Sequence, residues 1–184
     1  MLTALIILLV LVFALAIIAM AAYNGLVSKR NKVGNSWSQI DVQLKRRFDL
    51  IPNLLEVVKG YAAHERQTFE AVTQARNNYM SAGSHQQAMK ADRELSKGLG
   101  RLFAVAEAYP ELKSNGNFQE LQRELAKAED KIAFARQFYN DVTMDYNNAI
   151  QMFPSNILAN RFNFVEEPYF TVDGNETETP QIKF

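Results

Sequence analysis

The stretch "DLIPNLLEVVKGYAAHE", residues 49–65, decides how many helices the chain contains. It holds Pro52 inside a pattern whose apolar residues recur at helical spacing. Backbone N–H groups in the first turn of a helix have no partner within the helix, so proline, which lacks this group, is tolerated there. One interpretation is therefore that a new helix begins here, with Asp49 as its N-cap. The other is a single helix that kinks at Pro52, because the apolar stripe passes Phe48 and Ile51 without losing phase.

The two interpretations give different folds of one class. A start at Asp49 gives four soluble helices of comparable length, although it leaves almost no residues for a reversal of the chain. A kink at Pro52 gives three. In both cases the sequence predicts an all-α protein, with an N-terminal transmembrane helix followed by an elongated antiparallel up-and-down helical bundle.

Apolar residues at steps of three and four mark the first soluble helical region. They are Val33, Trp37, Ile40, Leu44, Phe48, Ile51, Leu55, Val58, Ala62, Phe69 and Val72. The stretch "SAGSHQQ", residues 81–87, interrupts this stripe, and Ser84 with Gln87 has the spacing of a capping box that begins the next helix. Gly98 and Gly100 inside that helix are interpreted as permitting close contact between helices.

Pro110 should end the second helical region near Tyr109, and Asn117 with Glu120 has N-cap chemistry for the third. The third region repeats apolar residues over about five heptads, which is typical of coiled-coil packing lengthwise against neighbouring helices. Pro154 ends this seam. Its members are Phe118, Leu121, Leu125, Ala128, Ile132, Ala135, Tyr139, Val142, Tyr146, Ala149 and Phe153.

Aromatic and amide side chains lie on and beside this seam. The aromatic ones are interpreted as bundle core rather than as the lining of a ligand pocket; they are Phe138, Tyr139, Tyr146 and Phe153. Three asparagines flank the seam, and any that is buried is expected to hydrogen-bond across helices and fix their register. These are Asn140, Asn147 and Asn148.

The composition changes after Pro154. Residues 155–174, "SNILANRFNFVEEPYFTVDG", are predicted to form one short helical turn and then an extended, aromatic-rich chain. Residues 175–184, "NETETPQIKF", are polar and acidic and are predicted to be mobile. We therefore expect a transmembrane anchor at 1–23, a helical bundle at 24–154 and a C-terminal tail at 155–184.

The N-terminal stretch "LTALIILLVLVFALAIIAMAA", residues 2–22, has Thr3 as its only polar side chain. About 20 apolar residues span the hydrocarbon core of a bilayer. A cleavable signal peptide is the alternative, but no basic residue precedes this run and the run is long. The sequence predicts an uncleaved transmembrane helix, with Tyr23 in the interfacial aromatic belt.

Basic residues follow the span, beginning with Lys29, Arg30 and Lys32. The positive-inside bias predicts a single-pass protein of the inner cell membrane, with Met1 outside and the bulk of the chain in the cytoplasm. The further run Lys45-Arg46-Arg47 has two interpretations, a contact for anionic phospholipid or a partner, and a solvated face near a helix end.

Composition and motifs argue against several classes of protein. Lys plus Arg and Asp plus Glu number 20 each, and a zero net charge argues against a nucleic-acid binder. The absence of cysteine excludes disulfides, thiol catalysis and cysteine zinc sites. His64-Glu65 lacks the second histidine of a zinc-protease motif, because position 68 is Thr68. The acidic pairs Glu166-Glu167 and Glu129-Asp130 are interpreted as surface charge. No catalytic, cofactor-binding or metal-binding residue and no enzyme activity is therefore predicted.

Several stretches resemble the LemA family in order and spacing. They are "YNGLV" (23–27), "RRFDLIPNLLEVVKGYAAHE" (46–65), "YPELKSNGNFQELQRELAKAEDKIAFARQFYN" (109–140) and "DYNNAIQMFPSNILA" (145–159). Family members commonly carry the pattern A-G-x-F-G-F near the end, where this chain has Asn160 and Asn163 in place of the glycines. Asparagine is the usual second choice where a positive φ is required.

The resemblance implies a membrane-anchored, antiparallel helical bundle, and it favours four helices over three. It brings no catalytic residue to carry over. Family genes tend to neighbour those of membrane proteases or other membrane proteins, and related proteins occur among the factors that build magnetosome membranes. We therefore expect a non-enzymatic bacterial scaffold that forms homo-oligomers on the lipid bilayer. A regulatory adaptor for a membrane protease or signalling system is the alternative, and a hydrolase that uses His64 is a weaker one.

Overall fold

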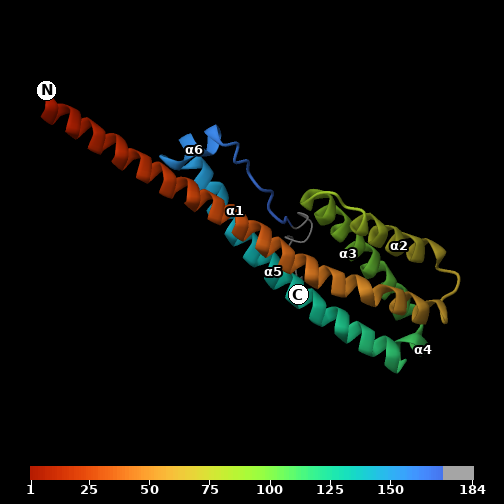
Figure 1. Cartoon of the computed structure of the whole chain (residues 1–184). Coiled ribbons are helices and arrows are strands. Elements are labelled where there is room, and N and C mark those ends of the chain that lie inside the picture. Colours follow the sequence, from red (N-terminus) through yellow and green to blue (C-terminus); the bar gives the residue numbers. More distant parts are fainter. Residues whose placement is uncertain (172–184) are drawn as a thin grey trace, which may run out of the picture. The chain divides into compact units, whose positions relative to one another are not determined.

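The computed structural model describes residues 1–171, and all regular structure in that part is helical, as the sequence predicts. Figure 1 shows the elements. They are α1 (Leu2–Lys59), α2 (Arg66–Met80), α3 (His85–Ala108), α4 (Pro110–Lys113), α5 (Gly116–Gln151) and α6 (Ser155–Arg161). The predicted mobile stretch, residues 175–184, lies outside the described part.

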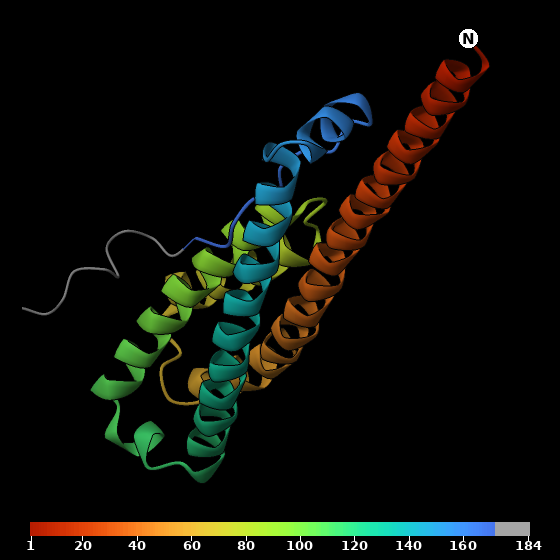
Figure 2. The ribbon, with the colours of Figure 1, turned by 90° about the vertical axis from the view of Figure 1, so that its left-hand side faces the viewer.

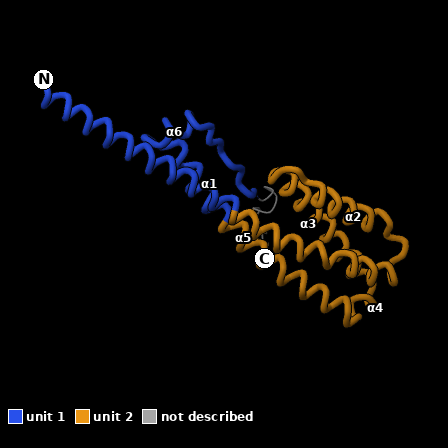
Figure 3. The backbone as a smooth tube through the Cα atoms, viewed as in Figure 1, with its two compact units in different colours: residues 1–34, 139–184 blue, residues 35–138 orange. Residues whose placement is uncertain are grey.

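The helices form two compact units, coloured separately in Figure 3. Unit 1 comprises Met1–Gly34 and the chain from Tyr139 onward, and unit 2 comprises Asn35–Phe138. The long helices α1 and α5 each contribute to both units.

Unit 2 is a bundle of the second half of α1, the hairpin of α2 and α3, and most of α5 (Figure 2). Its core follows the predicted stripes. Buried members include Ile40, Leu44, Phe48, Ile51, Val58, Phe69, Val72, Leu95, Leu102, Phe118, Leu125 and Ile132. At Gly98 an added Cβ would lie 3.0 Å from Cγ2 of Val72, so this glycine permits the close contact of α2 with α3. Gly100 has open space around it, so close contact does not explain it.

Helix α1 runs through Pro52 and ends at Lys59, so the prediction that a helix begins at Asp49 is wrong. Proline at position 52 cannot donate to the carbonyl of Phe48, four residues earlier. That carbonyl instead accepts a hydrogen bond from Nε of Arg76 on α2, at 3.3 Å. The chain reverses between Lys59 and Arg66, a position that neither interpretation of Pro52 gave, and the bundle still contains four long helices.

The helix starts show one correct and one incorrect prediction of a cap. The Ser84 hydroxyl accepts from the backbone N–H of Gln87 at 3.3 Å and begins α3, as predicted. For α5 the cap is Asn115 rather than Asn117, because the Asn115 side-chain oxygen accepts from the N–H of Phe118 at 3.1 Å. The capping oxygen thus comes from the asparagine that directly precedes Gly116, the first residue of α5.

Unit 1 contains the apolar N-terminal segment of α1. Every residue from 1 to 18 is exposed, half-burial begins at Ala19, and Leu26 is buried. The part of α1 after residue 18 is covered by α6 and the extended chain that follows it, since the ring of Tyr23 lies 4.8 Å from that of Phe162 and 5.9 Å from that of Phe164. The short helix and extended chain predicted after Pro154 are therefore both present. Two predicted core aromatics are not buried, because Phe138 and Phe153 are 45% and 80% exposed.

Candidate functional site

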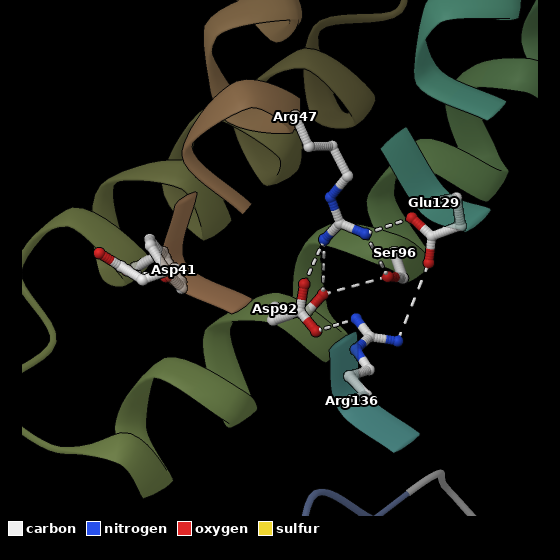
Figure 4. Close-up of polar contacts among 7 residues, drawn as sticks. Asp41, Arg47, Asp92, Ser96, Glu129 and Arg136 are labelled. Atoms are coloured by element: carbon white, nitrogen blue, oxygen red, sulfur yellow. Dashed lines mark hydrogen bonds and ion pairs between the residues drawn. The ribbon is translucent and has the colours of Figure 1, made fainter. Parts of the chain in front are cut away.

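A buried cluster of charges lies in the core of unit 2 (Figure 4). The side chain of Arg47 is only 1% exposed, so neither interpretation of the basic run 45–47 holds for this residue. Its guanidinium pairs with the carboxylate of Asp92 on α3 and donates to that of Glu129 on α5 at 2.7 Å. Lys45 and Arg46 are exposed, and Arg46 pairs with Glu124 at 3.0 Å.

Asp92 is the centre of this cluster and was not among the residues that the sequence marked. It is fully buried, and its two oxygens accept from the guanidinium groups of Arg47 and Arg136. Burial raises the pKa of the Asp92 carboxyl, and the two arginines act against that rise. A signal was present, since position 92 falls on the same helical face as Ala88 and Leu95, where an acidic residue is out of place.

The cluster balances its charges and ties together three helices. Two guanidinium groups face two carboxylates, and the Ser96 hydroxyl lies 3.4 Å from a terminal guanidinium nitrogen of Arg47. Removing one member of such a set leaves an uncompensated buried charge. A cavity of about 380 Å³ beside it is lined largely by apolar side chains, among them Leu99, Phe103 and Leu125. The cluster joins α1, α3 and α5, and the Ser96 hydroxyl within it donates to the backbone carbonyl of Asp92 at 3.2 Å rather than to a carboxylate.

A second polar cluster, in unit 1, attaches the extended chain to α5. We call residues 164–170 the strap. The side chains that hold it are Tyr139, Asn140, Tyr146 and Asn147, and we call these four the Tyr-Asn ladder. The Asn147 amide donates to the backbone carbonyl of Glu167 at 2.9 Å and accepts from its N–H at 3.0 Å. Asn140 makes the same pair of bonds with Phe170, at 2.9 and 2.8 Å. Each amide therefore satisfies both backbone groups of one strap residue, as a neighbouring β-strand would.

Two tyrosines complete the ladder. The hydroxyl of Tyr139 donates to the carbonyl of Pro168 and that of Tyr146 to the carbonyl of Val165, both at 2.9 Å. Both tyrosines are buried, as predicted for the seam. Burial raises the pKa of Tyr139 to about 12.

The spacing of the ladder explains the register of the strap. The dipeptide Tyr-Asn occurs at 139–140 and again seven residues later at 146–147. Seven residues of helix rise about 10.5 Å, and three residues of extended chain cover about 10 Å. The two asparagines accordingly bind strap residues three apart, Glu167 and Phe170, and the strap runs antiparallel to α5.

The asparagines thus differ from their predicted role. Asn147 is buried but bonds to the strap rather than across helices, and Asn148 is exposed. The repeat of Tyr-Asn at a spacing of seven was the available signal. The strap's own anchor is Phe164, which is buried beneath the guanidinium of Arg30 at 5.0 Å from the ring centroid.

The prediction that asparagine replaces glycine at positions of positive φ holds for Asn163 but not for Asn160. Asn163 adopts a φ of 53°, which agrees with the expectation that asparagine replaces a glycine there. Asn160 lies inside α6 and does not require a positive φ.

The residues tested for catalysis belong to different elements of the chain. His64 is exposed in the connection between α1 and α2. Glu129 belongs to the buried cluster rather than being plain surface charge, and Glu166 accepts from the Gln151 amide at 2.7 Å. Within residues 1–171, no three His, Asp or Glu side chains are placed so that they could hold a metal ion.

Comparison with known proteins gives a consistent result. Magnetosome protein MamQ 2 of Paramagnetospirillum magneticum is 29% identical, over 80% of this chain and 64% of its own length. Magnetosome protein MamQ of Magnetospirillum gryphiswaldense is 28% identical with the same coverage, so this chain spans under two thirds of these relatives. Protein LemA of Metamycoplasma hominis is 24% identical, over 80% of this chain and 68% of its own length. None of these names denotes an enzyme. The sequence profile of the LemA family matches residues 36–184, and the chain therefore belongs to the LemA family.

Proposed function

We propose that this chain is a non-enzymatic, membrane-anchored helical scaffold that assembles with copies of itself at the bilayer. The observation that carries the proposal is the change of burial along α1. Residues 2–18 are apolar apart from Thr3 and are exposed throughout, whereas Leu26, Val33 and Ile40 are buried. An apolar helix of this length without a protein cover is stable in hydrocarbon and not in water. One unbroken helix thereby joins a candidate membrane span to a folded bundle.

Self-assembly is tested on the full chain in detergent micelles by native mass spectrometry, and in membranes by chemical crosslinking. We expect a defined oligomer even when micelles far outnumber protein chains, because chains would then share a micelle only if they bind one another. A strict monomer that also captures no other membrane protein would overturn the scaffold proposal.

The orientation of the scaffold follows from the charges after the span. Lys29, Arg30 and Lys32 support a cytoplasmic position for the bulk of the chain, by the positive-inside bias. A protease added to intact cells should then leave a C-terminal epitope uncut, and cutting should require that the cells be opened. Cleavage in intact cells would reverse this orientation.

A regulatory adaptor for a membrane protease or signalling system is the second candidate function. The Tyr-Asn ladder favours it, because all four of its side chains bond to backbone groups of the strap, which shows that they can hold an extended peptide by its main chain. Pull-down with the anchored full chain should recover a membrane protein, and Phe162→Ser with Phe164→Ser should lose it. Recovery of the chain alone by both proteins would remove the basis for this candidate.

The hydrolase alternative depends on His64, whose side chain is exposed in a loop. A His64→Ala chain is expected to retain every cellular phenotype of the natural chain. A loss of phenotype with unchanged expression and folding would revive it.

A further inference from the structure

Exposed apolar side chains gather where α5 turns into α6, in the same unit as the candidate membrane span. We call Met152, Phe153, Ile157 and Phe162 the corner patch. Each is at least half exposed, Phe153 most of all, so residues 1–171 leave much of their surface uncovered. Apolar side chains of this size rarely cluster on a surface that faces only water.

The position of the corner patch along the span is given by contacts inside unit 1. The ring of Phe162 lies 4.8 Å from that of Tyr23, and burial of α1 begins at Ala19. The apolar run ends at Ala22, so Phe162 at the end of α6 meets α1 at the residue that directly follows the run. In a chain whose span crosses the bilayer, this level is the boundary between acyl chains and headgroups.

The charges around the corner patch fit the same level. Arg161 ends α6 and is exposed, and Arg30 lies two turns beyond Tyr23 with its guanidinium over the ring of Phe164. Arginine side chains at this level can reach the phosphate groups while aromatic and aliphatic side chains beside them enter the acyl boundary. A corner that combines both is suited to a lipid surface.

We propose that the corner patch is a second membrane contact, in which Phe153 and Ile157 insert into the headgroup and acyl boundary beside the span. The occupant of this surface is the lipid bilayer itself. The contact rests on the proposed membrane anchoring, and it adds that the turn between α5 and α6 is held at the bilayer rather than free in solution. It thereby fixes the end of α5 that carries the Tyr-Asn ladder at the membrane surface.

The test measures the depth of single tryptophans in full-length protein. Trp37→Phe removes the only natural tryptophan, and Phe153→Trp is added to that background. The protein is reconstituted into phosphatidylcholine vesicles brominated at acyl carbons 6,7 or 11,12. We expect the indole of the Phe153→Trp protein to be quenched at least twofold, and more by the 6,7 lipid than by the 11,12 lipid. Ile157→Trp in the same background should behave alike, which guards against a defect peculiar to one substitution.

Two control substitutions separate failure of the inference from failure of the anchor. Phe13→Trp lies in the exposed apolar segment, and its indole should be quenched most by the 11,12 lipid. Phe134→Trp is comparably exposed on α5, about 25 Å along the helix before its C-terminal end, and its indole should not be quenched.

Each outcome decides between explanations. If the Phe13→Trp protein is not quenched, the proposed anchor fails. If it is quenched while the Phe153→Trp and Ile157→Trp proteins emit as in water, the corner patch does not touch lipid and the inference is overturned. If the indole of the Phe153→Trp protein is shielded from water but unaffected by brominated lipid, protein covers the patch, and the inference is again overturned.

Discussion

The two units hold their polar groups in opposite ways. In unit 2, Arg47, Asp92 and Arg136 bond through charged side chains on three different helices. In unit 1, neutral amides and phenols of the ladder bond to the backbone of the strap. A charged pair needs its specific partner, because an unpaired buried charge is costly, whereas backbone groups are the same in every residue except proline. The cluster of unit 2 therefore requires its specific side chains, whereas the ladder's hydrogen bonds do not depend on the side chains of the strap residues that they reach.

The largest effect should come from breaking the buried charge cluster. Asp92→Asn keeps the shape of the side chain and leaves Arg47 and Arg136 facing a neutral group. Loss of one partner of a buried ion set costs about 3–5 kcal/mol of unfolding free energy. The measurement is urea unfolding of the full chain in detergent, followed by the fluorescence of Trp37, which lies in unit 2.

The matched control is an exposed pair. Glu124→Gln removes the partner of Arg46, and the change should be much smaller because solvent screens that pair. Equal losses of unfolding free energy for Asp92→Asn and Glu124→Gln would contradict the prediction, because they would show that the buried ion pairs stabilise the fold no more than an exposed one.

The next effect tests the substitute hydrogen bond at Pro52. Arg76→Met leaves the Phe48 carbonyl without its donor and should cost about 1–3 kcal/mol of unfolding free energy. In a Pro52→Ala chain, the new N–H at position 52 can donate to that carbonyl, so Arg76→Met should cost much less. Four urea unfolding curves form this double-mutant cycle. If the two substitutions are additive, Arg76 does not act through the Phe48 carbonyl.

These contacts show which parts of the structure the sequence could predict. The stripe of α1, the Ser84 cap and the exposed span follow from neighbours within one or two helical turns, where periodicity and capping chemistry act. The pairing of Arg76 with the Phe48 carbonyl and of Arg47 with Asp92 joins residues 28 and 45 positions apart. No local pattern reports such a pairing.

The end of α1 shows the same limit. Pro52 is a local signal for a helix boundary, but α1 continues through it, and Arg76 of α2 donates to the carbonyl that proline leaves without a donor. The strap is an intermediate case. Its extended conformation and the spacing of Tyr139 and Tyr146 are visible in the sequence, but the residues that they bind are not.

A smaller and more local effect should follow loss of one rung of the ladder. Asn147→Ala removes two hydrogen bonds to Glu167, worth about 1–2 kcal/mol together, from the strap and not from the bundle. Amide exchange of the peptide that covers the strap, measured by mass spectrometry, should accelerate about tenfold for a loss of about 1.4 kcal/mol. The urea midpoint reported by Trp37 should barely move.

Asn148→Ala is the control for this rung, because Asn148 is adjacent in sequence and exposed. It should leave strap exchange unchanged. A comparable acceleration in both variants would show that a general weakening of α5, rather than loss of the rung, frees the strap.

The smallest effect concerns the ionisation of Tyr139 in the ladder. It changes the unfolding free energy only at alkaline pH. Burial raises the pKa of Tyr139 to about 12, above the value of about 10 expected in the unfolded chain. The folded state therefore binds more protons between these values, so the contribution of Tyr139 is complete below pH 10 and is lost as pH rises toward about 12. Unfolding free energy measured from pH 8 to 11.5 should fall less steeply for Tyr139→Phe than for the natural chain.

Tyr79 in unit 2 should act in the same direction, because burial and its hydrogen bond to Asp41 raise its pKa. It should add to the fall of unfolding free energy with pH in both proteins. If the curves of the natural chain and Tyr139→Phe are parallel throughout, the phenol of Tyr139 ionises as freely in the folded chain as in the unfolded one, and the ladder is open to water.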